Sequence, residues 1–428
     1  MMAYFPLVAL LVLFVINVPV AFAIAMSTLI YFLFASGLPI NIFIQKLVSS
    51  THSFPLLAVP FFITAGIVMN YGGITKRLMA LADALTGHMV GGLAQVNVVL
   101  STLMGGLAGS ANADAAMQSK ILVPEMIKRG YGKEFSAVIT ACSSIIAPII
   151  PPGIGLILYG FLADQSIGRL FLGGILPGLM LCLSLMFVVH RVSRQRGYRS
   201  ARESRVTAPE LLKAIQDSLW AMLIPIGIIG GIRFGIFTPT EAGAICVFYA
   251  LLIGFFAYGD LKIQHLPKIL VEAVLSTSVI MLIICSATAL GFYMSWERIP
   301  IVLTKALTTW FTDPFWLLLS INVFLLLVGM FVEGSASLIL LTPLLVPIVS
   351  AAGIDLVHFG IVIVLNLTIA GVTPPLGTLM YTTCSIVDVS VHKFSRELIP
   401  FLMILIIDLI LISYVPALVL FLPDLVMG

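Results

Sequence analysis

The sequence predicts an all-α integral membrane protein made of two inverted repeats, each with one re-entrant helical hairpin and one broken helix. Of its 428 residues, 60% are hydrophobic and only 10% are charged, and the mean hydropathy is +1.16. Soluble domains carry about 25% charged residues, so this chain has too little charge to cover a water-facing surface. The basic residues lie in short loops between apolar runs, and nucleic acid is therefore not an expected partner.

Nine apolar stretches are long enough to cross a lipid bilayer, which takes about 20 residues of helix. The first is too long and uninterrupted for a cleavable signal peptide, and no small-residue cleavage site follows a short apolar core. Two further apolar regions, 90–118 and 314–349, are interrupted by small and polar residues. Such backbone survives at membrane depth only under a cover of protein or beside a water-filled cavity, so we expect re-entrant hairpins there. The predicted crossings are 5–34, 54–70, 135–160, 168–190, 219–235, 240–258, 270–292, 358–382 and 399–422.

Six arginines follow His190 within the segment 191–205. Cytoplasmic loops carry an excess of Lys and Arg, so we place this loop in the cytoplasm. Tracing the chain both ways then puts 17 of the 22 Lys and Arg residues on the same side. The bias holds only if both interrupted regions are hairpins; the alternative is that the charge balance is accidental.

Three short motifs occur twice in the same order. Leu-Val-Pro begins at 122 and 345, Pro-Pro at 151 and 374, and Gly-Ser-Ala at 109 and 334. We therefore predict a first repeat over 1–190 with a broken helix at 135–160, and a second over 236–428 with a broken helix at 358–382. The basic loop and a linking helix, 191–235, lie between them, and that extra crossing starts the second repeat on the opposite side. Inverted repeats with broken helices indicate a secondary transporter.

The interrupted segments predict where ions bind. Proline lacks an N–H and glycine relaxes the backbone, so both unwind a helix and free its carbonyl oxygens. Carbonyl and hydroxyl oxygens are ligands that a hard cation accepts. The alternative is that these small residues merely allow close helix packing. The predicted cation ligands are Gly109, Ser110, Asn112, Pro151, Gly153, Gly334, Ser335, Ser337, Gly371, Thr373, Pro374 and Gly377.

The half-helices beside these breaks predict an anion site as well, because helix N-termini carry partial positive charge. Asp114 is a functional candidate, since an ionisable group at membrane depth is costly; its alternative role is to cap a half-helix. If it faces the substrate, its charge would repel a second carboxylate, and no Lys or Arg lies at either break. A hydroxyl-rich monoacid therefore fits best. The predicted substrate ligands are Ser110, Asn112, Asp114, Ser335 and Thr378.

Several motifs together resemble the large membrane subunit (M subunit) of tripartite ATP-independent periplasmic (TRAP) transporters, members of the ion transporter superfamily. They are Gly-Ser-Ala-Asn-Ala-Asp-Ala-Ala-Met (109–117), Val-Pro-Glu-Met (123–126), Arg-Gly-Tyr (129–131), Ile-Pro-Pro (150–152) and Thr-Pro-Thr-Glu-Ala (238–242). The resemblance covers essentially the whole chain. It implies an elevator mechanism in the bacterial inner membrane, coupling to Na⁺ at the paired breaks, a small four-helix membrane subunit and a periplasmic substrate-binding protein as separate chains.

We therefore predict sodium-coupled import of an organic acid, with sialic acid (N-acetylneuraminate) favoured and C4-dicarboxylates or another sugar acid as alternatives. A proton-coupled carrier is a further alternative, but only Asp114 and Glu333 near the breaks could carry protons. An enzyme is not expected. The sequence has no His-Glu-x-x-His motif and no histidine placed to activate Ser110 or Ser335, and its five cysteines show no paired spacing.

Overall fold

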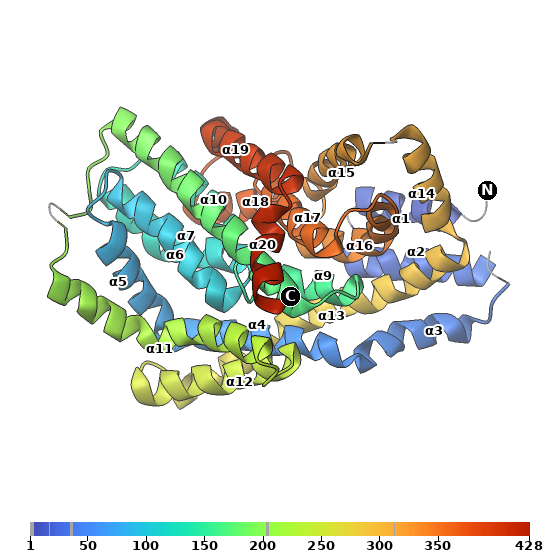
Figure 1. Cartoon of the computed structure of the whole chain (residues 1–428), viewed down its shortest axis with the longest axis horizontal. Helices are drawn as coiled ribbons and strands as arrows, with labels where there is room; N and C mark the ends of the chain where they lie inside the picture. The colour runs from blue at the N-terminus through green and yellow to red at the C-terminus, as the bar shows by residue number, and fades with distance from the viewer. Residues whose placement is uncertain (1–3, 17, 35–36, 203–204, 312) are drawn as a thin grey trace.

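The computed structural model describes residues 4–16, 18–34, 37–202, 205–311 and 313–428, and every regular element in these ranges is a helix (Figure 1). By length and composition, seven of the described helices could cross a membrane. The predicted all-α membrane class is thus confirmed. These seven are Phe54–Tyr71, Ile167–Arg196, Ala208–Arg233, Pro239–Ala257, Ile263–Trp296, Gly334–Ala351 and Val391–Tyr414.

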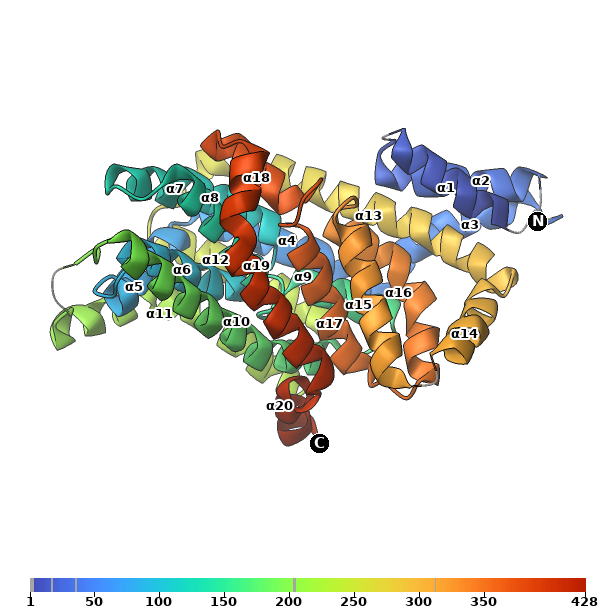
Figure 2. The same ribbon diagram turned by 90° about the horizontal axis from the view of Figure 1, so that it is seen from above.

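The first predicted crossing, 5–34, is wrong as a single span. It forms two helices that pack on each other, α1 (Phe5–Val15) and α2 (Val20–Phe34). Pro19 directly precedes α2, and a proline cannot donate the backbone hydrogen bond that would continue a helix. Figures 1 and 2 both place these helices at one end of the long axis of the molecule.

Both interrupted regions are helical hairpins. The first consists of α6 (Gly92–Ala108) and α7 (Ala111–Lys128), and the second of α15 (Pro314–Gly329) and α16 (Gly334–Ala351). The return arm α7 continues ten residues beyond the predicted end at 118. Pro124 lies inside α7 without ending it, so the helix runs through the Leu-Val-Pro motif.

The two arms of each hairpin join the rest of the chain at the same end of the hairpin. Before α6, the Gly87 carbonyl accepts from the Ala201 and Arg202 amides (2.8 and 3.0 Å), and just after α7 the Arg129 guanidinium donates to the Ala201 carbonyl (3.0 Å). The loop 197–202 thus contacts the chain both just before α6 and just after α7. At the second, the Tyr414 hydroxyl donates to the Phe315 carbonyl (3.0 Å).

The two hairpins open toward opposite ends of α19 (Val391–Tyr414), which at 24 residues is about 36 Å long. An ion pair of 2.6 Å between Arg196 and Glu397 joins the end of α10 (Ile167–Arg196) to the start of α19, on the side of the loop 197–202. Tyr414, which contacts the start of α15, is the last residue of α19. His358 lies shortly after α16, and its Nε2 is 2.8 Å from the Ile412 carbonyl near the same end.

This arrangement predicts that the open end of the first hairpin and the open end of the second hairpin face different compartments. We expect Arg199→Cys to react with an impermeant maleimide only from the cytoplasm, and Ala351→Cys only from outside, because both residues are exposed. Cys285 is half-buried and the other four cysteines are buried, so the background is Cys285→Ser and the parent chain is the control. Labelling of both sites from one side would contradict the prediction.

The broken helices follow each hairpin. The first consists of α8 (Lys133–Ser143), the short η4 (Ser144–Ile146) and α9 (Ile154–Leu162). The second consists of α17 (Leu356–Ala370) and α18 (Thr378–Val387). Each break holds a Pro-Pro pair, at 151–152 and 374–375.

The two stretches share one order of elements. Helices α7 and α16 start at 111 and 334, and α8 and α17 start at 133 and 356, 223 positions apart in both cases. Helices α9 and α18 start at 154 and 378, and α10 and α19 at 167 and 391, 224 positions apart. The repetition seen in three short motifs therefore extends to whole helices.

The other helices differ from the predicted spans mainly at their ends. The last predicted span, 399–422, is divided at Pro416 into α19 and α20. Glu241 forms a capping box with Thr238 at the start of α12. Helices α3, α5 and α14 were not predicted. The remaining elements are α3 (Ile40–Ser49), η2 (Ser50–His52), η3 (Phe54–Leu57), α4 (Ala58–Tyr71), α5 (Ile74–Thr86), α11 (Ala208–Arg233), α12 (Pro239–Leu252), η5 (Ile253–Ala257), η6 (Ile263–His265), α13 (Leu266–Trp296), α14 (Ile299–Trp310) and α20 (Ala417–Met427).

The two halves interlock around the breaks. Helix α18 of the second half packs against α7 of the first, and α16 packs against α9. The Tyr159 hydroxyl of α9 also donates to the Leu356 carbonyl at the start of α17 (2.7 Å). This cross-packing brings the two hairpin tips and the two breaks to one place.

Candidate binding cavity

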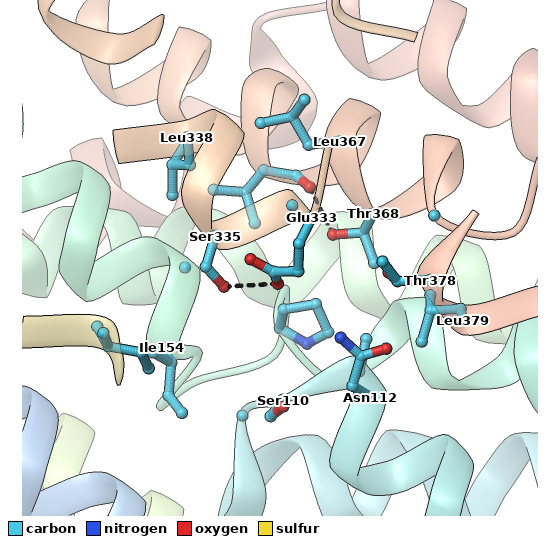
Figure 3. A pocket seen from close by; sticks show the side chains of 18 residues that line it. Ser110, Asn112, Ile154, Glu333, Ser335, Leu338, Leu367, Thr368, Thr378 and Leu379 are labelled. Atoms are coloured by element: carbon cyan, nitrogen blue, oxygen red, sulfur yellow. Dashed lines mark hydrogen bonds between the residues drawn. The ribbon is translucent and has the colours of Figure 1, made fainter. Parts of the chain in front are cut away.

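A cavity of about 100 Å³ lies where the two hairpin tips meet the two breaks. Its walls come from both halves of the chain, with Ile280 of α13 added at one side. Figure 3 shows Ser110 and Asn112 of the first hairpin facing Glu333 and Ser335 of the second. Segments more than 200 residues apart thus share one cavity.

Seven of the predicted ligands line this cavity. They come from both tips and from the second break. The structure brings together Gly109, Ser110, Asn112, Gly334, Ser335, Gly371 and Thr378.

Six other predicted cation ligands lie outside the cavity wall. The Ser337 hydroxyl donates to the Val332 carbonyl (3.3 Å), and the Thr373 hydroxyl to the Ile369 carbonyl (2.9 Å). Both hydroxyls keep lone pairs that could accept a cation, but they do not face the substrate space. The remaining four belong to the breaks themselves: Pro151, Gly153, Pro374 and Gly377.

Asp114 does not face the cavity, contrary to the expectation that it contacts the substrate. Its Oδ2 accepts from the Ser101 hydroxyl (2.6 Å) and from the Gln118 amide (2.8 Å), between the two arms of the first hairpin. The helix turns by about 100° per residue. Asp114 therefore points roughly 200° away from Asn112, which lines the cavity.

Glu333 supplies the carboxylate that does line the cavity. Its Oε2 accepts from the Ala336 amide (2.9 Å), and its Oε1 accepts from the Ser335 hydroxyl (3.0 Å), so it caps α16. Among the described lining residues it is the one with an ionisable side chain. The signal that identifies it is an acidic residue directly before the Gly-Ser-Ala tip, in the position that Ser110 occupies as the cap of α7.

Sequence reasoning missed most of the apolar wall. Thr368 is the one further hydroxyl in it, and its Oγ1 donates to the Val364 carbonyl (2.6 Å; Figure 3). No motif marks these residues, because each is an ordinary apolar position of a helix. From the sequence, Glu333 was named only as a possible proton carrier. The lining that was not predicted is Ala111, Pro148, Ile154, Gly155, Ile280, Leu338, Val364, Leu367, Thr368 and Leu379.

Four half-helices begin at the cavity. Its wall includes the first residues of α7, α9, α16 and α18, which are Ala111, Ile154, Gly334 and Thr378. Side chains cap α7 and α16, whereas α9 and α18 have no side-chain cap. Helix N-termini present backbone N–H groups and partial positive charge, so this arrangement can hold an anion without a lysine or arginine.

The breaks are held in place by backbone hydrogen bonds. In the first half, the Ile154 amide donates to the Gly109 carbonyl (3.1 Å), which ties the hairpin tip to the break. In the second, the Leu379 and Met380 amides donate to the Gly371 carbonyl (2.9 and 3.2 Å). The tip and the break of the first half are therefore positioned as one unit.

Comparisons with known proteins agree with this architecture. The sequence profile of the family described as "Tripartite ATP-independent periplasmic transporter, DctM component" matches residues 7–418. The chain is 38% identical to the sialic acid TRAP transporter large permease protein SiaM of Vibrio cholerae, over 96% of each protein. It is 37% identical to the isethionate TRAP transporter permease protein DctMQ of Oleidesulfovibrio alaskensis, over 95% of this chain and 64% of that one. The solved structure of MtrF from Neisseria gonorrhoeae has a similar fold, with a TM-score of 0.60 at 12% identity over 94% of each chain.

Proposed function

Because the chain belongs to the DctM-component family of tripartite ATP-independent periplasmic transporters, which are multi-pass permeases of the inner membrane and not enzymes, we propose that it imports an organic acid by sodium-coupled, elevator-type transport. One observation carries the proposal. Both hairpin tips and the N-termini of four half-helices converge on a single cavity. Such a cavity suits an anion at the helix ends and cations at the freed oxygens beside them.

Sodium is the coupling ion in this proposal. The tips and breaks offer hydroxyl, amide and carbonyl oxygens, which are ligands for a hard cation. Proton coupling is the second candidate, and Glu333 is the group at the cavity that could carry a proton. Its two oxygens already accept hydrogen bonds from Ser335 and Ala336, so this carboxylate has a structural role as the cap of α16.

The elevator part of the proposal rests on the two hairpins. The hairpins open toward opposite ends of α19, and the two halves of the chain pack against each other around the breaks. We infer that the stretches from α6 to α10 and from α15 to α19 are inverted repeats. A cavity held between two such repeats can move as one body, so that one tip opens on each side in turn.

The substrate in this proposal is a hydroxylated monoacid, with sialic acid favoured. Glu333, rather than Asp114, is the carboxylate that would repel a second negative charge and accept hydrogen bonds from hydroxyl groups. The described residues of the lining include no Lys or Arg to hold a second carboxylate. The relatives do not decide between substrates, because those named for sialic acid and for isethionate are 38% and 37% identical. C4-dicarboxylates remain the alternative.

The proposed partners are a small four-helix membrane subunit and a periplasmic substrate-binding protein. The relative named DctMQ is longer than this chain, which spans 64% of it. The extra length of that protein supports a second membrane subunit as a partner of this chain.

The experiment is uptake into proteoliposomes that hold this chain and its small subunit. We expect sialic acid to enter only with an inward sodium gradient and a loaded binding protein, and a proton gradient alone to give little uptake. Succinate with its own binding protein is the matched substrate arm. Strong uptake without a binding protein, or uptake that ignores sodium, would sink the proposal; preference for succinate would sink the substrate assignment alone.

A further inference from the structure

A buried polar cluster lies between the arms of the first hairpin, apart from the cavity. Asp114 of α7 is 1% exposed, and Gln118 of α7 and Ser101 of α6 are 0% exposed. The Gln118 amide nitrogen is 2.8 Å from Asp114 Oδ2 and 2.6 Å from the Ser101 Oγ. The Ser101 hydroxyl donates to the same Asp114 oxygen (2.6 Å). These three side chains form the hairpin cluster.

Two oxygens of the hairpin cluster have no hydrogen-bond partner among the residues that the structure describes. They are Asp114 Oδ1 and Gln118 Oε1, both fully inside the protein. None of the ion pairs formed by the described residues includes Asp114. The N-terminus of α7 offsets part of the negative charge but supplies no hydrogen bond to Oδ1. A buried carboxylate in this condition is strongly unfavourable unless a positive charge joins it.

The second hairpin shows that the fold itself does not need this acid. At the positions 223 residues further on, Ser337 replaces Asp114 and Leu341 replaces Gln118. The Ser337 hydroxyl is satisfied by the Val332 carbonyl, and Leu341 is buried in an apolar contact. The same helix position thus packs well without charge, so the carboxylate of the first hairpin has another purpose.

We propose that the hairpin cluster is a binding site for a monovalent cation, taken by sodium during transport. Its free ligands are oxygens, which a hard cation accepts, and its single negative charge balances a single positive one. The site is separate from the predicted ligands at the tips and breaks. The proposal rests on the proposed sodium coupling and adds to it an ion site present in one repeat only.

Binding there would act on the cavity through α7. Asp114 lies four residues after Ser110, the cap at the tip, and two after Asn112, which lines the cavity. Both free oxygens belong to α7, and the Ser101 hydroxyl of α6 donates to the same Asp114 carboxylate. A cation on these oxygens would therefore fix the side chains through which the start of α7 contacts α6. The hairpin tip would then be ordered before the substrate binds, so ion binding would raise the affinity for the substrate.

The test is equilibrium binding of radioactive sodium to the purified chain with its small subunit, at constant ionic strength with choline. The variants copy the second repeat: Asp114→Ser and Gln118→Leu. We expect Asp114→Ser to bind one sodium ion fewer per chain, and Gln118→Leu to weaken that ion about tenfold. Asp388→Asn, whose side chain is 98% exposed, is the control for loss of charge and should bind sodium like the parent.

An unchanged number and affinity of sodium ions in both variants would overturn the proposal. The proton is the competing occupant: sodium binding would then stay unchanged while uptake loses its dependence on pH in Asp114→Ser. If Asp114→Ser does not fold, shown by its thermal unfolding, Gln118→Leu decides alone. A parent chain that binds sodium but shows no sodium-driven uptake would refute the proposed function and leave this site standing.

Discussion

Gly109→Ala is expected to abolish uptake while the protein still inserts into the membrane. Gly109 joins the two arms of the first hairpin with φ of +56°, a conformation that costs an L-residue about 1–2 kcal/mol. A Cβ there would lie 2.3 Å from the Pro152 carbonyl oxygen, which no side-chain motion can relieve. The tip must then move off the break and lose the hydrogen bond from the Ile154 amide (3.1 Å).

Gly197→Ala is the matched control for this prediction. Gly197 ends α10 with φ of +69°, but a Cβ there meets no atom of the described residues within 4 Å. It carries the conformational cost without the clash. We expect initial uptake rates to fall at least about a hundredfold in Gly109→Ala, the effect of roughly 3 kcal/mol, and to stay within a few-fold of the parent in Gly197→Ala. Similar losses in both variants would show that backbone strain, and not the contact between tip and break, limits transport.

Glu333→Gln is expected to admit dicarboxylates. The amide keeps the size of the side chain and an oxygen for the Ala336 amide, but it removes the negative charge from the cavity. Two like charges about 6 Å apart repel by roughly 1–3 kcal/mol at the dielectric constants between water and a protein surface. We therefore expect the ratio of succinate to sialic acid uptake to rise about 5- to 100-fold, measured with each substrate's own binding protein.

Asp355→Asn is the control for Glu333→Gln. Asp355 also caps a helix, α17, and accepts from the His358 amide (2.9 Å), but it lies outside the cavity. Its replacement should leave the uptake ratio unchanged. An unaltered ratio of succinate to sialic acid uptake in Glu333→Gln would mean that this carboxylate does not discriminate substrates by their charge. The argument for a monoacid would then lose its basis.

The hairpins and the breaks could be predicted because local chemistry marks them. Glycine and Pro-Pro interrupt a helix wherever they occur in the fold, so the tips at Gly109 and Gly334 and the breaks after Ala147 and Ala370 were readable from the sequence. Helices α1 and α2 were not separable, because both flanks of their turn are apolar. Helix α5 was missed because it is shorter and more polar than a span and is held in place by packing with α6 and α11.

The cavity was predictable only in part. Four of the predicted ligands lie directly at a hairpin tip or a break: Ser110, Asn112, Ser335 and Thr378. Any fold that joins the tips and the breaks places them together. Asp114 was misplaced because its direction depends on which residue caps α7, a detail that fixes the rotation of every later side chain. The apolar wall depends on packing between the halves, which short motifs do not record.

The cavity divided between the two halves has a consequence for how such a chain could arise. A polypeptide with only the elements α6 to α10 would present two of the four helix starts and one tip, an open surface rather than a cavity. It could enclose a solute only by pairing with a second, upside-down copy of itself. Each half would then have been free to change once both were encoded together. The differences between Asp114 and Ser337 and between the caps Ser110 and Glu333 are of the kind that a fused gene permits and a self-paired one does not.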